Sequence, residues 1–90
     1  MMHRLYCLKD VLVGFSTPFD MSNDDVAVRA FAGSAQSPEP NAVNVNPEHK
    51  QLWFVGTFDD QTAAFTSEPV FLADAAPFCR RKEVEPNDLA

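Results

Sequence analysis

Three stretches of the chain alternate between apolar and polar positions with the period of two that is typical of β-strands. They lie near residues 4–14, 51–58 and 63–66. In the second stretch, one side of the strand is expected to present Leu52, Phe54, Gly56 and Phe58, and the other Trp53, Val55 and Thr57. Aromatic and β-branched residues favour such a pleated surface. The pattern therefore predicts a small antiparallel sheet of three or four strands.

Two adjacent carboxylates, Asp59 and Asp60, separate the second stretch from the third. Aspartate favours tight turns because its side chain accepts hydrogen bonds from nearby backbone amides, and a connection of three to five residues is ordinary for a hairpin. Two neighbouring carboxylates without further ligands make a poor metal site. We interpret the pair as the tip of a hairpin.

The first stretch is apolar on both faces. One face would carry Leu5, Cys7, Val11, Val13 and Phe15, and the other Tyr6, Leu8 and Leu12. Such a strand usually lies inside a sheet or against a partner. Gly14 is expected to mark a bulge or a bend, and Pro18 breaks the pattern because proline cannot donate to a sheet ladder.

One helix is predicted over residues 23–35, with Ser22 or Asn23 as its N-cap. Two aspartates follow in the first turn, where carboxylates interact favourably with the helix dipole. Phe31 belongs to both apolar stripes of the helix, so we expect it to be the main anchor in the core. Gly33 weakens the last turn.

The remaining chain is expected to be loop with little regular structure. Asn46-Pro47-Glu48 is typical of a short helical turn, with proline at its first position. Residues 70–72 fit either a strand or the start of a second helix within 68–76, and the pattern does not distinguish them. We predict an α+β fold, an antiparallel sheet with one helix packed on one face, as a single domain over residues 1–78. The charged residues 79–90 are expected to form a mobile tail.

Composition narrows the classes of function. The chain has 90 residues, an apolar fraction of 46% and a formal net charge of −6. The apolar fraction is normal for a globular domain, but a domain this small is marginal alone, and association with further copies is a common remedy. We therefore expect a homodimer or a larger oligomer. The negative charge disfavours strong electrostatic binding to nucleic acids or to anionic membranes.

The sequence also predicts the compartment. No apolar run approaches the roughly 18 residues needed to span a bilayer, and the start of the chain lacks the apolar core of a secretion signal. Cys7 and Cys79 are widely separated, so free thiols in a reducing compartment are favoured over a disulfide.

Motifs of catalysis or metal binding do not emerge from the sequence. The three glycines are scattered and form no phosphate-binding loop. His3 and Cys7 lie four residues apart on one strand face and could in principle share a metal, but a terminal histidine beside a buried cysteine is the favoured interpretation. The serines, cysteines and histidines show no recognisable nucleophile–base arrangement. We expect a non-enzyme without a cofactor or metal.

Eight residues are candidates for contact with nucleic acid. The candidates for contact with phosphates are Arg4, Lys9, Arg29, Lys50, Arg80, Arg81 and Lys82, and Trp53 could stack on a base. The phenylalanines could offer further stacking faces. Each also has an ordinary structural explanation. The run of three basic residues precedes acidic residues, and Trp53 occupies a position that is typical of core aromatics.

The order of motifs resembles the small nonstructural protein of gokushoviruses, the microvirus branch with circular single-stranded DNA. The shared residues are Leu5, Tyr6 and Asp10 in the opening strand; Pro18 and Phe19; Ala27, Val28, Arg29 and Phe31 in the helix; Asn46, Pro47 and Glu48; and Gly56, Phe58, Asp59 and Asp60 in the hairpin. The resemblance spans residues 4–66. That family is often labelled a DNA-binding or replication-switch protein.

The resemblance implies a phage accessory protein that helps to turn duplex replication toward single-strand synthesis for packaging. We therefore expect a non-enzymatic protein in the host cytoplasm that binds single-stranded DNA weakly, or binds phage replication or capsid proteins. The alternative is a structural or scaffolding protein that contacts coat subunits during assembly.

Overall fold

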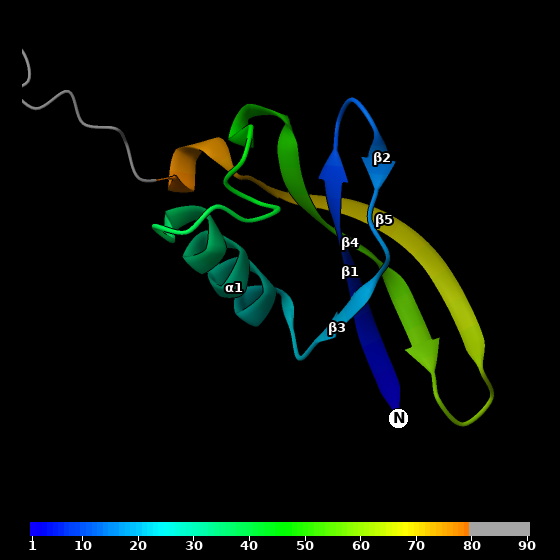
Figure 1. Ribbon diagram of the computed structural model, residues 1–90. Helices are drawn as coiled ribbons and strands as arrows, with labels where there is room; N and C mark the ends of the chain where they lie inside the picture. The colour runs from blue at the N-terminus through cyan, green and yellow to red at the C-terminus, as the bar shows by residue number, and fades with distance from the viewer. Residues whose placement is uncertain (80–90) are drawn as a thin grey trace, which may run out of the picture.

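The computed structural model describes residues 1–79 and shows an α+β fold with one helix and a curled antiparallel sheet (Figure 1). The elements are β1 (Met2–Asp10), β2 (Gly14–Phe15), β3 (Phe19–Met21), α1 (Asp24–Gln36), η1 (Pro47–His49), β4 (Lys50–Asp59), β5 (Ala64–Asp74) and η2 (Ala76–Phe78). Strands β2, β1, β4 and β5 lie side by side in that order as a half-barrel, and the further strand β3 pairs with β1. The predicted fold class is confirmed.

The first predicted strand, 4–14, is wrong as a single element. β1 ends at Asp10, the chain turns through residues 11–13, and Gly14 begins β2, which pairs back onto β1. The turn is closed by a hydrogen bond from the Val13 amide to the Asp10 carbonyl (2.9 Å). Its apolar residues face solvent, with Val13 85% exposed. An apolar tip imitates the pattern of a continuous strand, and this is why the turn was missed.

Strand β3 was also missed, because Pro18 breaks the alternation just before it. Phe19 and Met21 are partly buried against the core, while Asp20 between them is exposed. Three residues are too few for a periodic signal, and only their pairing with β1 makes them a strand.

The third strand is longer than predicted. β5 runs without interruption from Ala64 to Asp74, so the predicted segments 63–66 and 70–72 belong to one strand. Pro69 lies within it, and this is tolerated because β5 is an edge strand whose register against β4 shifts at that point. The short helix η2 then follows. The strand alternative for residues 70–72 is therefore confirmed.

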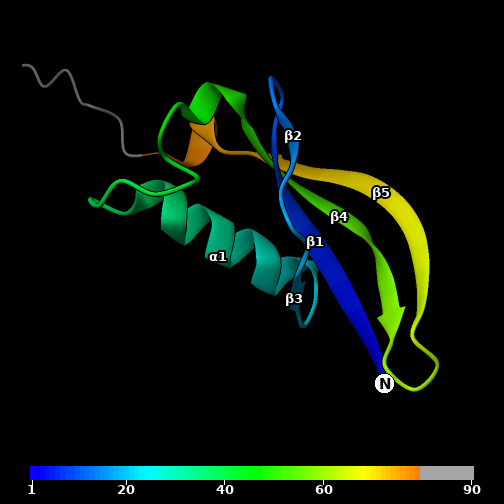
Figure 2. The ribbon, with the colours of Figure 1, turned by 45° about the vertical axis from the view of Figure 1, so that its right-hand side comes forward.

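The curl of the sheet has a local cause in β4. Leu5 pairs with Gly56 but Tyr6 pairs with Phe54, so Val55 is an extra residue against β1. Such bulges increase the twist of a sheet, and β5, drawn in yellow, bends strongly along its length (Figure 2).

The bulge also reverses the faces of β4. Leu52 and Phe54 lie on the side of α1, but Phe58, beyond the bulge, pairs with His3 on the opposite side. The expected alignment of Phe58 with Phe54 on one face is therefore wrong. One inserted residue is enough, because side chains alternate with a period of two.

The helix agrees with its prediction within one residue at each end. Asn23 is the N-cap, and its side chain accepts a hydrogen bond from the Val26 amide (2.9 Å). Phe31 is buried and packs edge-on to Phe78, with ring centroids 6.3 Å apart. The core between α1 and the sheet consists of Tyr6, Ala27, Phe31, Ala35, Val43, Leu52, Phe54 and Ala75.

Two local predictions in the loops are also confirmed. Pro47 opens the short helix η1, directly after Asn46 in a left-handed conformation. Asp59 ends β4 and accepts a hydrogen bond from the Gln61 amide (2.9 Å), as expected for a hairpin turn. Cys7 and Cys79 carry free thiols.

The helix offers a stability prediction at Gly33. This residue is exposed on α1, and a methyl group built on it meets no atom within 4 Å. Replacing Gly33 by alanine should stabilise the protein by about 0.5–1 kcal/mol, because alanine loses less backbone entropy in a helix. A urea titration measures this change. A loss of stability would show that the position needs glycine for a reason outside the helix.

Candidate nucleic-acid interface

The helix covers only one face of the sheet, and no other described element covers the opposite face (Figures 1 and 2). We call this opposite surface of β1, β4 and β5 the open face. The residues of β1 on the open face are His3, Leu5, Cys7 and Lys9, because these alternate with Arg4, Tyr6 and Leu8 on the helix side.

No described helix is long and apolar enough to cross a membrane.

Three aromatic side chains from three strands lie next to one another on the open face. The rings of Phe15 and Trp53 meet edge-on with centroids 5.5 Å apart, and those of Trp53 and Phe71 meet edge-on at 5.9 Å. We call these three residues the aromatic row. Phe15 is 49% exposed and Phe71 is 45% exposed, so the outer members of the row remain accessible to solvent.

Among the residues that the structure describes, one ammonium group lies over this row. The Nζ atom of Lys9 is 4.9 Å from the centroid of Phe15 and 5.0 Å from that of Trp53. Both distances suit cation–π attraction. Strand register explains the arrangement. Lys9 pairs with Phe15, and Cys7, the next residue on the same face of β1, pairs with Trp53, so the side chain of Lys9 lies close to both rings.

Polar neighbours orient the indole of Trp53. Its Nε1 donates to Oε1 of Gln51 (2.9 Å), and Nε2 of Gln51 donates to Asp74 (3.3 Å). Beside it, Cys7 is buried, and burial raises the pKa of its thiol. A thiol of raised pKa is a poor nucleophile, so this part of the open face offers stacking and hydrogen bonding.

A second aromatic group occupies the other end of the open face. Phe58 and Phe65 lie with centroids 4.7 Å apart, and the ring of His3 is 6.1 Å from that of Phe58. Phe65 is 72% exposed. Between the two aromatic groups lies a mainly apolar hollow of about 230 Å³, whose lining includes Leu5, Val55 and Gly56. The open face thus presents apolar surface along much of its length.

Of the predicted contact residues within 1–79, the structure brings together only Lys9 and Trp53. Arg4 lies on the helix side, where its Nη2 donates to Asp24 (2.8 Å) and its guanidinium carbon lies 4.1 Å from the ring centroid of Phe54. Lys50 donates to two loop carbonyls, of Ala42 (3.1 Å) and Val45 (2.7 Å). Both side chains are therefore engaged in holding the fold.

The other candidates are placed differently. Arg29 is exposed on α1. The predicted tail 79–90 lies almost wholly outside the described residues, and with it Arg80, Arg81 and Lys82.

The pairing of strands singles out two site residues, Phe15 and Phe71, which the sequence named only collectively, among the phenylalanines that could offer stacking faces. In the sequence, Phe15 belonged to the first predicted strand and Phe71 to an ambiguous segment. Each lies beside Trp53 only because β2 folds back on β1 and β5 pairs with β4. Their signal in the sequence was weak, because a phenylalanine in a strand is equally typical of a core residue.

Three acidic side chains are placed on the open face: Asp20 and Asp60 lie beside His3, and Asp74 is bonded to Gln51 next to Trp53. His3 is held between two of them, with Nδ1 2.6 Å from Asp20 and Nε2 2.8 Å from Asp60. The ring therefore separates the two carboxylates, and one metal ion cannot contact all three side chains. Within residues 1–79, no group of three or more His, Cys, Asp or Glu side chains is arranged to hold a metal.

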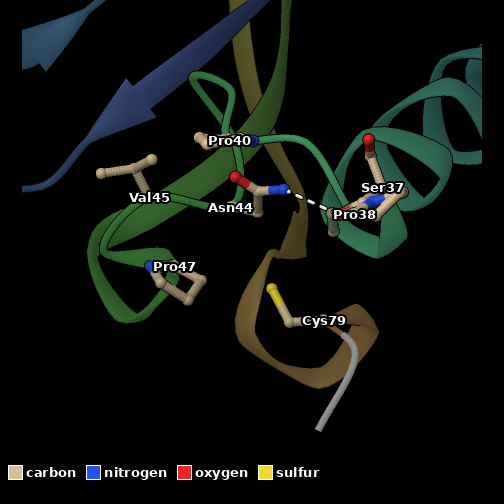
Figure 3. A pocket seen from close by; sticks show the side chains of 8 residues that line it. Ser37, Pro38, Pro40, Asn44, Val45, Pro47 and Cys79 are labelled. Carbon is tan, nitrogen blue, oxygen red and sulfur yellow. Dashed lines mark hydrogen bonds between the residues drawn. The ribbon is translucent and has the colours of Figure 1, made fainter. Parts of the chain in front are cut away.

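A separate depression of about 360 Å³ lies at the C-terminal end of α1 (Figure 3). Its lining consists of Ala35, Ser37, Pro38, Pro40, Asn44, Val45, Pro47 and Cys79. Asn44 donates to the Ser37 carbonyl (3.1 Å), while Asn41 donates to that of Ser34 (2.8 Å). These side-chain amides satisfy carbonyls at the helix end, where a helix lacks internal partners. The asparagines of this loop thus serve the fold.

Comparison with known proteins places the chain in a family. A model of the phage ORF5 protein family matches residues 3–78, from β1 to the end of η2. Searches of curated proteins and of solved structures found no match. Because the family model spans nearly all of the described fold, including both aromatic groups of the open face, the chain belongs to the phage ORF5 protein family.

Proposed function

We propose that this phage protein is a non-enzymatic accessory protein of single-stranded DNA genome replication or packaging, of the gokushovirus type, and that it acts in the host cytoplasm. The observation that carries the proposal is the aromatic row of Phe15, Trp53 and Phe71 with Lys9 above it, on a sheet face that no described element covers. The motif order shared with the gokushovirus protein supports the virus branch.

The chemistry of this face suits unpaired bases. Stacking of a base on an aromatic ring contributes about 1–3 kcal/mol and needs no particular sequence. A duplex keeps its bases stacked inside, so the aromatic row can reach them only in a single strand. The proposal of a non-enzyme rests on the same row: in the described part of the chain it provides aromatic rings and one ammonium group, which suit binding.

The charge of the protein sets the expected strength of binding. With a net charge of −6, the protein as a whole repels DNA. Each phosphate neutralised on a single strand contributes about 0.7 to the salt dependence of binding. Lys9 on the open face and the basic run Arg80, Arg81 and Lys82 supply at most four phosphate contacts. We therefore expect weak binding with a salt slope of only about two or three.

The proposal predicts that Phe71→Ala weakens binding to a labelled oligothymidine by about 1–3 kcal/mol, roughly fivefold to 150-fold, because one stacking ring is lost. Fluorescence anisotropy measures the affinity, and quenching of Trp53, the one tryptophan of the chain, reports contact at the row. Val70→Ala is the matched control, since Val70 is the exposed neighbour that pairs with Phe54 on the other face.

A second pair of variants tests the charge. Lys9→Gln should lower the salt slope by about 0.7. Arg29→Gln removes a positive charge from the helix instead and should leave the slope unchanged. No binding at low salt, or an equal loss in both members of either pair, would contradict the proposal. Tight duplex binding with a steep slope would contradict the argument from charge.

A second candidate function is a scaffold that contacts coat subunits. It is favoured by one observation: the turn between β1 and β2 exposes Val11, Leu12 and Val13 together, with Leu12 73% exposed. Exposed apolar groups of this kind are typical of protein interaction sites. Co-sedimentation with coat protein, lost when Leu12 and Val13 are replaced by serine, would support it. The apolar open face also supports self-association, which sedimentation measures.

A further inference from the structure

His3 joins three parts of the sheet at one end of the open face. Its Nδ1 lies 2.6 Å from Oδ2 of Asp20 in β3, and its Nε2 lies 2.8 Å from Oδ2 of Asp60 in the turn between β4 and β5. His3 itself belongs to β1. We call these three side chains the His3 bridge.

The geometry of the bridge requires a protonated ring. An ionised carboxylate only accepts hydrogen bonds, and a neutral imidazole carries a single N–H. A neutral ring can therefore donate to one of the two aspartates, and its other nitrogen would then set a lone pair against an anionic oxygen. Only the imidazolium form, with an N–H on each side, satisfies both contacts.

We propose that the His3 bridge is a proton-dependent link that holds β3 and the β4–β5 turn to β1 when the imidazole is charged, and releases one of the two when it is neutral. The proposal concerns the folded protein alone and does not depend on DNA binding. Phe58 packs beside the ring of His3 and contacts the exposed Phe65. The bridge therefore also positions the second aromatic group.

The charged groups around His3 support this assignment. The amino group of Met1 donates to Oδ1 of Asp60 (2.7 Å), and Gln61 donates to the same oxygen (3.3 Å). Arg4, next along β1, points to the other face and is paired with Asp24. From β4 the ring is faced by Phe58, which carries no charge. The acceptors thus come from β3 and the β4–β5 turn.

Electrostatics favour the charged ring. Hydrogen bonds to Asp60 and then to Asp20 raise the pKa of His3 above its ordinary value. Hydrogen bonds from the Met1 amino group and from His3 hold the pKa of Asp60 well below its ordinary value. Because the folded pKa of His3 is raised, its stabilisation is complete below about pH 6.5, the unfolded value, and is lost as the pH rises through the folded value.

The test is an NMR titration of the full chain. Ring nitrogen shifts follow His3 and, in the same spectrum, His49, the other histidine of the sequence. We expect His3 to carry both protons at about pH 6 and to titrate above about 6.5. The backbone amides of Asp20 or of residues 60–63 should shift with the same midpoint as the ring.

Asp60→Asn is the decisive variant. An asparagine amide can donate to the unprotonated nitrogen of a neutral ring, so both contacts survive without the second proton. The midpoint of His3 should then fall toward its ordinary value, and the turn amides should no longer follow it. Glu39→Gln removes the same charge from a distant loop, and the titration of His3 in this variant should match that in the wild type.

Two results would overturn the proposal. One is a His3 midpoint at or below about 6.5 in the wild type. The other is a ring that titrates as expected while the amides of both β3 and the turn stay unchanged. A variant that fails to fold is recognised from its amide spectrum. In that event His3→Gln serves instead, since a neutral amide should abolish the fall in melting temperature that we expect for the wild type from about pH 6 to about pH 9.

Discussion

Replacing Gly56 by alanine will destabilise the protein more than any other exchange of glycine for alanine in the chain. Gly56 has φ +144°, a conformation that L side chains rarely adopt, and a methyl group built on it would lie 2.0 Å from the carbonyl oxygen of Thr66. That oxygen belongs to the backbone of β5, so it cannot move aside without loss of strand pairing. Strain and overpacking each cost about 1–3 kcal/mol, and their sum sets the expected loss, on the order of 2–6 kcal/mol. Urea titration measures it.

Gly14 is the matched control for this prediction. It has φ +131°, but an added methyl group meets nothing within 4 Å. Gly14→Ala therefore carries the conformational strain without the collision, and should cost only about 1–3 kcal/mol. If the two variants were equally stable, the close approach of β4 and β5 at Gly56 would not constrain the fold.

Truncation of Phe31 to alanine should cost about 3–5 kcal/mol, as is usual for buried aromatic residues. Phe31 is buried, contacts Phe78 edge-on, and lines an existing apolar hollow of about 140 Å³ between α1 and the sheet. Removing the ring enlarges that hollow, and the cost of such a substitution grows with the volume left empty. The total stability of a small domain is of similar size, so the variant should be close to unfolded at ambient temperature.

Val26→Ala supplies the comparison on the same helix, because Val26 is exposed and lies outside the core. Surface substitutions of this kind usually change stability by less than about 0.5 kcal/mol. Equal effects of Phe31→Ala and Val26→Ala in a urea titration would show that α1 does not anchor the core through Phe31.

The two aromatic groups of the open face differ in their electrostatic surroundings. The row around Trp53 has the ammonium group of Lys9 over its rings, whereas beside Phe58 and Phe65 the ring of His3 and the amino group of Met1 are paired with the carboxylates of Asp20 and Asp60. A phosphate next to a base stacked on the row can therefore reach the ammonium group of Lys9, whereas the cationic groups beside Phe58 and Phe65 are already bound to carboxylates. This asymmetry makes Phe71, rather than Phe65, the informative position for the binding experiment.

The local elements of this protein follow from its sequence alone. The helix over Asp24–Gln36, the short helix after Asn46 and the hairpin turn at Asp59 each depend on neighbours within a few residues: a cap, a proline at a first helical position, or an aspartate at a turn. The burial of Phe31 also follows, because an amphipathic helix must direct its apolar stripe toward the core. The local signal failed at residues 11–13, where apolar side chains occupy a turn.

Only the tertiary structure decided which side chains meet across strands. The extra residue Val55 moves Phe58 to the open face, and pairing of β2 and β5 with their neighbours sets Phe15 and Phe71 beside Trp53. The same pairing sets His3 between Asp20 and Asp60, which are 17 and 57 residues away along the chain. Register across a sheet depends on bulges and turns, and a shift of one residue exchanges the two faces of a strand. The alternation in the sequence therefore predicts that a strand has two faces, but only the pairing of strands determines which side chains lie together on each face of the sheet.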